Sequence, residues 1–242
     1  MALSLTSALG DAAAWARKEF LLLLVLLLAS SGLLGFAILA SEVSEGETHA
    51  FDEALLLALR TSDSTGDPIG PRWVEAVFRD VTSLGGPTVI TLITGLTVGY
   101  LLLARRYGTA FLVLAAIGSG ALVSFVLKDT MDRPRPDLVS HLVDVQTASF
   151  PSGHATLSAV VYLTIGALLA REQPSRGLRF YVMAVAILAT VLIGCSRVYL
   201  GVHWPTDVLA GWAIGSAWAM LWWIVAWVGM ARHRAAEPEP GR

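Results

Sequence analysis

The sequence predicts an all-α, polytopic membrane protein with six transmembrane helices and short amphipathic helices in the first outside loop. Of its 242 residues, 55% are hydrophobic and 15% are charged, and the mean hydropathy is +0.65. A soluble domain carries about 25% charged residues, so this composition is that of a membrane protein. The apolar residues also gather in six runs near the length of about 20 residues that crosses a bilayer as a helix.

The six runs, with approximate ends, are 20–40, 88–104, 109–127, 155–170, 180–195 and 208–230. Two basic residues precede the first run, as they do in a signal peptide, but its apolar stretch exceeds the ~7–15 residues of a signal core. We therefore expect a retained span there. The six spans would form a single domain over 1–236, and the polar tail at 237–242 is expected to be disordered.

The charges between the runs differ in sign from one side of the membrane to the other. Six spans place both chain ends on one side, which then holds ten basic and five acidic residues, against seven basic and fourteen acidic on the opposite side. Cytoplasmic loops are enriched in Lys and Arg. We therefore expect a multi-pass protein of the cell (inner) membrane, with cytoplasmic termini and with its polar motif loops on the periplasmic or extracellular face.

The longest predicted loop covers 41–87 and opens with acidic residues. Apolar side chains then recur at helical spacing over 51–59 and, after a break rich in Gly, Pro and Asp, over 73–84. This pattern predicts two short amphipathic helices that lie on the membrane surface or cover the bundle. Two interpretations stay open for them: packing alone, or a lid or rim through which a lipid enters.

The stretch 196–207 places an Arg, a His and an Asp between two apolar runs. Charged groups at the edge of a bilayer are costly to desolvate and usually functional. Pro205 suits the first turn of a helix, so His203 and Asp207, four residues apart, are expected on one face at its start. The carboxylate can then hold one ring nitrogen of His203 and leave the other free to attack. The planar fork of Arg197 suits a phosphate or carboxylate.

Two more polar segments meet span ends on the same predicted side. Lys128 ends the third run, and Arg135 follows in a loop that two prolines hold extended. On its own this pair could equally be an interfacial charge cluster that orients the span. At the fourth run, Ser152 can cap the helix, Gly153 lets a ligand approach the backbone closely, and His154 lies in the first turn. The N–H groups of such a helix start point toward a bound anion.

Together these segments resemble the type 2 phosphatidic acid phosphatase (PAP2) family, whose motifs are Lys-x6-Arg-Pro, Pro-Ser-Gly-His and Ser-Arg-x5-His-x3-Asp. The matching residues are Lys128 with Arg135-Pro136, Pro151-Ser152-Gly153-His154, and Ser196-Arg197 with His203 and Asp207. All three motifs match in order and without a substitution. They lie within residues 128–207, about a third of the chain.

The resemblance implies a bacterial integral-membrane phosphatase that acts on a lipid phosphate or diphosphate. His203 would attack phosphorus and form a phosphohistidine, while Asp207 would fix its tautomer. His154 would protonate the leaving oxygen and then activate water. The phosphate-binding groups would be Lys128, Arg135, Ser152, Gly153 and Arg197. Undecaprenyl diphosphate, phosphatidylglycerol phosphate and phosphatidate are all plausible substrates.

The sequence shows no cluster of carboxylates and histidines at metal-ligand spacing, so no metal or other cofactor is predicted. The expected partners are a lipid phosphate substrate and membrane lipids, without nucleic acid, and the sequence does not indicate an oligomeric state. Three alternatives stay open. They are a lipid phosphotransferase with the same histidine chemistry, a vanadium haloperoxidase, which the six spans disfavour, and a transporter or scaffold without enzyme activity.

Overall fold

The computed structural model describes residues 2–145 and 147–236, and side chains at 16 and over 18–145 and 147–229. Its elements are α1 (Ala2–Glu45), α2 (His49–Leu57), β1 (Arg60–Thr61), β2 (Ser64–Pro68), α3 (Arg72–Ser83), α4 (Pro87–Leu103), α5 (Tyr107–Met131), α6 (Gly153–Glu172), α7 (Arg176–Tyr199) and α8 (Pro205–Ala236). The tail predicted at 237–242 lies outside the described residues. The single-domain assignment over 1–236 stays a prediction.

Five helices in the described part of the chain are long and apolar enough to cross a membrane: α1, α5, α6, α7 and α8. The remaining predicted span, over 88–104, corresponds to α4, whose 17 residues fall short of the length of about 20 that a bilayer needs. It reaches that length only together with α3, from which it is bent by 47°. The protein is therefore a multi-pass, helical membrane protein whose described residues hold five candidate spans, or six if α3 and α4 form one broken span.

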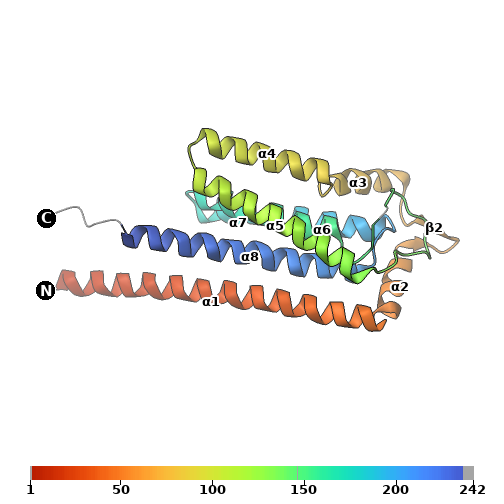
Figure 1. Ribbon diagram of the computed structural model, residues 1–242, viewed down its shortest axis with the longest axis horizontal. Coiled ribbons are helices and arrows are strands. Elements are labelled where there is room, and N and C mark those ends of the chain that lie inside the picture. The colour runs from red at the N-terminus through yellow and green to blue at the C-terminus, as the bar shows by residue number, and fades with distance from the viewer. Residues whose placement is uncertain (1, 146, 237–242) are drawn as a thin grey trace.

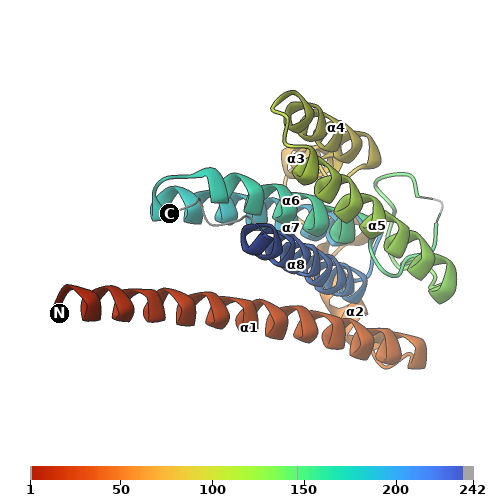
Figure 2. The ribbon, with the colours of Figure 1, turned by 60° about the vertical axis from the view of Figure 1, so that its left-hand side comes forward.

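The long helices lie side by side in one bundle, and α1 runs along its outside next to α8 (Figures 1 and 2). The start of α1 and the end of α8 lie at one end of the bundle, whereas α2, the hairpin and α3 lie at the other (Figure 1). Helices α5 and α7 end, and α6 and α8 begin, at this second end. The fold therefore brings together the chain segments that carry the three motifs.

Helix α6 lies at the centre of the bundle, because it packs against α5, α7 and α8. Two glycines of α8 permit a close approach between α6 and α8. A Cβ on Gly211 would lie 2.8 Å from the carbonyl oxygen of Ser152, and one on Gly215 would lie 2.5 Å from that of Thr156. Small residues let membrane helices pack with their backbones close together. This contact fixes the start of α6, which carries His154, against the start of α8.

Local sequence signals explain where these helices begin. Pro87 opens α4 and Pro205 opens α8, because proline has no N–H to lose in a first turn. Ser152 and Ser175 cap α6 and α7, since each hydroxyl accepts a backbone N–H three residues later. Between α2 and α3 the chain forms an antiparallel hairpin of β1 and β2, an element that the apolar spacing of 41–87 does not predict.

Candidate active site

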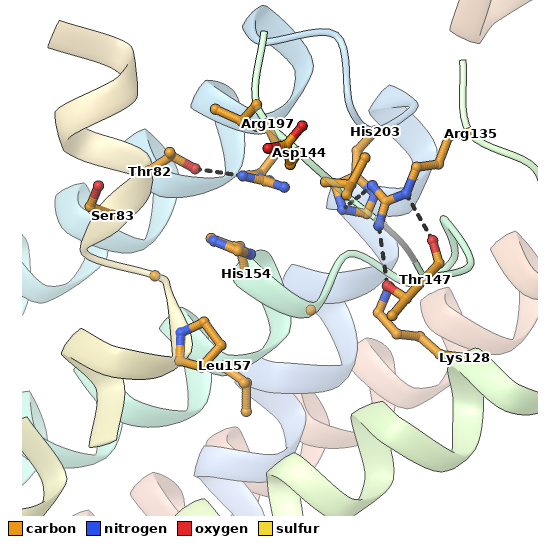
Figure 3. Close-up of a pocket in the computed structure, with 15 residues that line it drawn as sticks. Thr82, Ser83, Lys128, Arg135, Asp144, Thr147, His154, Leu157, Arg197 and His203 are labelled. Carbon is orange, nitrogen blue, oxygen red and sulfur yellow. Dashed lines mark hydrogen bonds between the residues drawn. The ribbon is translucent and has the colours of Figure 1, made fainter. Parts of the chain in front are cut away.

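A cavity of about 400 Å³ lies where the motif segments meet, at the end of the bundle that carries α2 and α3. Six of the eight predicted site residues line it: Lys128, Arg135, Gly153, His154, Arg197 and His203. Figure 3 shows the side chains of Arg135, His154, Arg197 and His203 around one common space. The other two, Ser152 and Asp207, are fully buried behind this wall.

His203 and Asp207 form a buried pair, with His203 Nδ1 lying 3.3 Å from Asp207 Oδ2. The spacing predicts that His203 lies on the same helical face as Asp207. In the structure His203 lies instead in the turn that precedes Pro205. The two side chains still meet because Asp207, in the first turn of α8, reaches back and also accepts the N–H of Trp204 at 2.9 Å. A carboxylate can only accept, so Nδ1 carries the proton and Nε2 keeps its lone pair.

Nε2 of His203 faces the cavity beside Arg135, whose Nη1 lies 3.3 Å away. Burial lowers the pKa of His203 to about 3, with nearby Asp207 opposing the shift and Arg135 and Arg197 adding to it. The ring is therefore neutral at physiological pH. With its proton on Nδ1, the ring accepts a hydrogen bond from Arg135 at Nε2. A neutral imidazole whose unprotonated nitrogen faces a cationic cavity has the form that a nucleophile requires.

Arg135 and Lys128 are held by backbone carbonyl groups rather than by carboxylates. Arg135 donates through Nε to the carbonyl oxygen of Thr147 at 2.8 Å and through Nη1 to that of Val202 at 2.5 Å. Lys128 Nζ donates to the carbonyl oxygen of Ala148 at 2.6 Å. Carbonyl groups orient both cations without neutralising them. Their charges stay available to an anion in the cavity.

Arg197 approaches the cavity from the end of α7. Its Nη1 donates to Oγ1 of Thr82, on α3, at 2.9 Å, and both residues are buried. Its Nε has no hydrogen-bond partner among the described residues. An unpaired buried guanidinium nitrogen is costly unless a ligand accepts from it. Asp144 is the only acidic side chain among the described residues that line the cavity, so the excess charge there is positive.

His154 lies in the first turn of α6, and its ring packs against the Gly85-Gly86 turn between α3 and α4. A Cβ on Gly85 would lie 3.3 Å from Cδ2 of this ring, so the turn leaves room for it. Gly153 lines the cavity, and a Cβ there would lie 3.4 Å from Cε of Lys128. The hydroxyl of Ser152 accepts the N–H of Ala155 at 3.5 Å. A role for Ser152 in binding phosphate stays a prediction.

Four residues that sequence reasoning did not assign to the site hold the predicted ones in place. They are Asp52, Thr82, Arg133 and Ser149. Arg133 forms ion pairs with Asp52 and Asp207, and Ser149 donates its hydroxyl to Oδ2 of Asp207. The short spacing from Arg133 to Arg135 was a signal that went unused. Nothing in the apolar spacing of 41–87 marks Asp52 or Thr82, because their partners Arg133 and Arg197 lie 81 and 115 residues further along the chain.

No group of three or more His, Cys, Asp or Glu side chains that could hold a metal ion occurs among the described residues. The donors around the cavity are of another kind. Lys and Arg side chains donate hydrogen bonds and bind oxygen anions directly. The arrangement can therefore position a phosphate group between fixed cations, with His203 on one side and His154 close by.

Comparison with known proteins agrees with this geometry. The PAP2 superfamily matches residues 109–231. The chain is 33% identical over 182 residues to phosphatidylglycerophosphatase B of Bacillus subtilis. The aligned region covers 74% of this chain and 85% of the relative. It is 41% identical over 68 residues to an undecaprenyl-diphosphatase of Sulfolobus acidocaldarius, over 28% of this chain and 29% of the relative.

A solved structure has a similar fold as well. The crystal structure of a transmembrane PAP2-type phosphatidylglycerolphosphate phosphatase from Bacillus subtilis superimposes with a TM-score of 0.75 and 31% identity, covering 83% of this chain and 96% of that one. The family match over residues 109–231 includes all three motifs, which lie within residues 128–207. On these grounds the chain belongs to the PAP2 superfamily.

Proposed function

We propose that this protein is an integral membrane phosphatase that hydrolyses a lipid phosphate or diphosphate through a phosphohistidine on His203. One observation carries the proposal. Three cationic side chains and two histidines converge on one cavity, and a buried nitrogen of Arg197 has no partner there among the described residues. A phosphoryl group would supply the missing acceptor. Membership of the PAP2 superfamily supports a phosphatase.

In the first step, the lone pair on Nε2 of His203 attacks phosphorus in line with the leaving oxygen. The P–N bond forms as the P–O bond to the lipid breaks. His154 takes up a proton as the anionic phosphate enters the cationic cavity, and gives that proton to the leaving oxygen. Asp207 accepts a hydrogen bond from Nδ1–H and stabilises the positive charge that develops on the ring. The cations Lys128, Arg135 and Arg197 stabilise the equatorial oxygens, where the charge of a phosphoryl transition state resides.

In the second step, the neutral His154 takes a proton from a water molecule as that water attacks phosphorus. The P–N bond breaks, inorganic phosphate leaves, and His203 returns to its neutral form with the proton still on Nδ1. Each proton that His154 gives in the first step is therefore recovered in the second. The cycle consumes one water molecule and releases the dephosphorylated lipid.

Fixed cations supply the charge stabilisation in this scheme, so we propose that turnover needs no metal. Removing one preorganised donor of this kind from an enzyme costs about 10²–10³-fold in turnover. The proposal requires full activity in the presence of a chelator.

The names of two relatives state that they act on phosphatidylglycerophosphate and on undecaprenyl diphosphate. A site at one end of the bundle suits such substrates, because the headgroup enters the cavity while the tails stay in the bilayer. The loop charges support cytoplasmic termini in the inner membrane and a site on the periplasmic or extracellular face. We propose this orientation for the protein.

The decisive test is phosphate release by purified protein in detergent with EDTA. Undecaprenyl diphosphate, phosphatidylglycerol phosphate and phosphatidate would be compared, with His203→Ala as the control. We expect metal-independent release that the variant lacks, and ³²P label that stays on wild type after an alkaline quench, is lost in acid as a P–N bond would be, and is absent from His203→Ala. Loss of substrate without phosphate release would indicate transfer to a second lipid. No consumption of any lipid by folded protein would refute the proposal.

A further inference from the structure

Behind the catalytic pair lies a buried chain of charged groups that reaches into the first loop. Arg133 Nη1 lies 2.6 Å from Asp207 Oδ1, and its Nη2 lies 2.7 Å from Asp52 Oδ2. The side chains of both aspartates are 0% exposed and that of Arg133 is 10% exposed. One guanidinium thus joins an aspartate of α2 to the aspartate that contacts His203.

Each oxygen of Asp207 has a defined partner in this arrangement. Oδ1 accepts from Arg133, while Oδ2 accepts from the Trp204 N–H, the Ser149 hydroxyl and His203 Nδ1. The carboxylate therefore cannot rotate without losing several charge-assisted hydrogen bonds. Such bonds are the strong ones in a protein interior. Of these groups, Arg133 alone carries a fixed positive charge toward Asp207.

Arg133 is itself fixed from several sides. Its Nη2 also donates to Thr48 Oγ1 at 3.2 Å, its Nη1 to Thr206 Oγ1 at 2.9 Å, and its guanidinium lies 5.6 Å from the ring centre of Trp204. The planar fork presents a separate nitrogen to each carboxylate, a geometry that the single ammonium nitrogen of lysine does not have. The position of Arg133 between Asp52 and Asp207 is therefore specific to an arginine.

Asp52 also reaches the helix that carries Asp207. Its Oδ1 accepts the backbone N–H of Thr206 at 2.9 Å, and its Oδ2 accepts the Thr206 hydroxyl at 2.7 Å. The carboxylate from α2 thus satisfies one of the free N–H groups at the start of α8, where negative charge is favourable. Asp52 consequently holds both Arg133 and the first turn that presents Asp207.

We propose that Asp52 and Arg133 are positioning residues, which hold Asp207 in the orientation where Oδ2 meets Nδ1 of His203. This inference rests on the proposed function, because it assumes that His203 is the nucleophile. It assigns part of the 41–87 segment to the active site. The two residues touch neither the substrate nor the reacting atoms, so their loss should lower the rate of the chemical step and leave phosphate binding intact.

The test compares Asp52→Asn, Arg133→Gln and the double variant with two matched controls, Glu53→Gln and Arg106→Gln. Glu53 is the neighbouring carboxylate on α2, and Arg106 forms an exposed ion pair with Glu172 away from the cavity. Because small misplacements in an active site cost up to about 10²-fold, we expect kcat to fall by about 10- to 100-fold in the test variants. We expect KM and inhibition by inorganic phosphate to change by less than about twofold.

Orthovanadate supplies a readout that a purely structural role would not change. It adopts the five-coordinate geometry of the phosphoryl transition state when a nucleophile bonds to it, so its affinity depends on the orientation of His203. We expect vanadate inhibition to weaken by the same factor as kcat, while phosphate inhibition is preserved. Since both residues act through Asp207, the double variant should be no slower than Arg133→Gln alone.

Removing one partner of a buried charge pair can prevent folding, so Arg133→Lys serves as a second variant. It keeps the buried positive charge but reaches only one carboxylate, and we expect it to lower kcat by about tenfold or more. Wild-type kcat in folded Asp52→Asn would overturn the proposal. An equal loss of phosphate and vanadate binding would overturn it too, because the network would then support the whole fold.

The outcome can be separated from a failure of the proposed function. If the folded wild type releases no phosphate from any lipid, the proposed function is refuted. The positioning role can still be tested by measuring how much vanadate raises the unfolding temperature of each variant. We expect that rise to be larger in the wild type and Glu53→Gln than in Asp52→Asn. Equal shifts in all three proteins, including no shift in any, would overturn the positioning role.

Discussion

Replacing Thr82 with valine tests whether the proposed phosphate site depends on a residue outside the three motifs. The Thr82 hydroxyl accepts a hydrogen bond from Arg197 Nη1 at 2.9 Å, and the two residues are 6% and 4% exposed. Valine has nearly the same shape but no acceptor. Because Nε of Arg197 already lacks a partner among the described residues, the substitution would leave a second nitrogen of this buried cation unpaired.

The size of the effect follows from this geometry. A hydrogen bond to a charged group contributes about 1.5–3 kcal/mol, and leaving such a group buried and unpaired carries a similar cost. If the guanidinium moves to recover a partner, that free energy is lost from the transition state. At about 1.4 kcal/mol for each factor of ten, kcat/KM should fall by about 10- to 100-fold. The overall fold should persist, because only one polar contact at the end of α3 is removed.

The assay is phosphate release from the lipid that the wild type turns over fastest, with folded protein quantified by size-exclusion chromatography in detergent. Thr82→Ser is the matched variant, since it keeps the hydroxyl and removes only a methyl group. We expect Thr82→Ser to retain most of the wild-type kcat/KM. Equal kcat/KM values for Thr82→Val and Thr82→Ser would refute the argument that this hydroxyl orients Arg197.

Two further predictions concern the segment around His203. Because burial lowers the pKa of His203 to about 3 from 6.5, its ring should stay neutral from pH 8 to 5. Ring ¹⁵N shifts, assigned with His203→Ala, would show this, and protonation near pH 6.5 would contradict it. Because the unfolded state binds the ring proton more readily than the folded state, the contribution of His203 to folding stability is complete above pH 6.5. It is lost as the pH falls toward 3. Gly201→Ala should cost at least about 1–2 kcal/mol, because Gly201 has a φ of +75° and its Cβ would lie 2.7 Å from the carbonyl oxygen of Ser140. A lowered unfolding temperature, compared with Gly177→Ala on an open surface, would show this effect, and equal temperatures would contradict it.

Much of the fold could be predicted because a membrane imposes a simple pattern on sequence. Apolar runs of sufficient length identified α1, α5, α6, α7 and α8, and helical spacing within 41–87 matched two short helices. The status of α4 could not be predicted, because its length alone does not show that it joins α3 at a bend. The small hairpin also escaped prediction, since its strands are only two and five residues long.

The candidate site was predictable to the extent that its residues lie in local motifs. The spacing of His203 and Asp207 anticipated their contact, although the turn before α8, rather than a shared helical face, brings them together. The partners of these residues could not be predicted in the same way. Thr82 meets Arg197, and Asp52 meets Arg133, through contacts that only the packing of α2 and α3 onto the bundle creates.

These contacts give the 41–87 segment a role that neither packing alone nor a lid describes. Through Arg133, α2 supports the acidic partner of the proposed nucleophile, and α3 contacts Arg197, a proposed phosphate-binding cation. In this proposal the three motifs supply the groups that meet the phosphate, but their orientation depends on side chains outside them. A related chain could therefore keep all three motifs and still be slow, if it lacked counterparts of Asp52 and Thr82. Variation in turnover among such chains should follow these supporting positions rather than the motifs themselves.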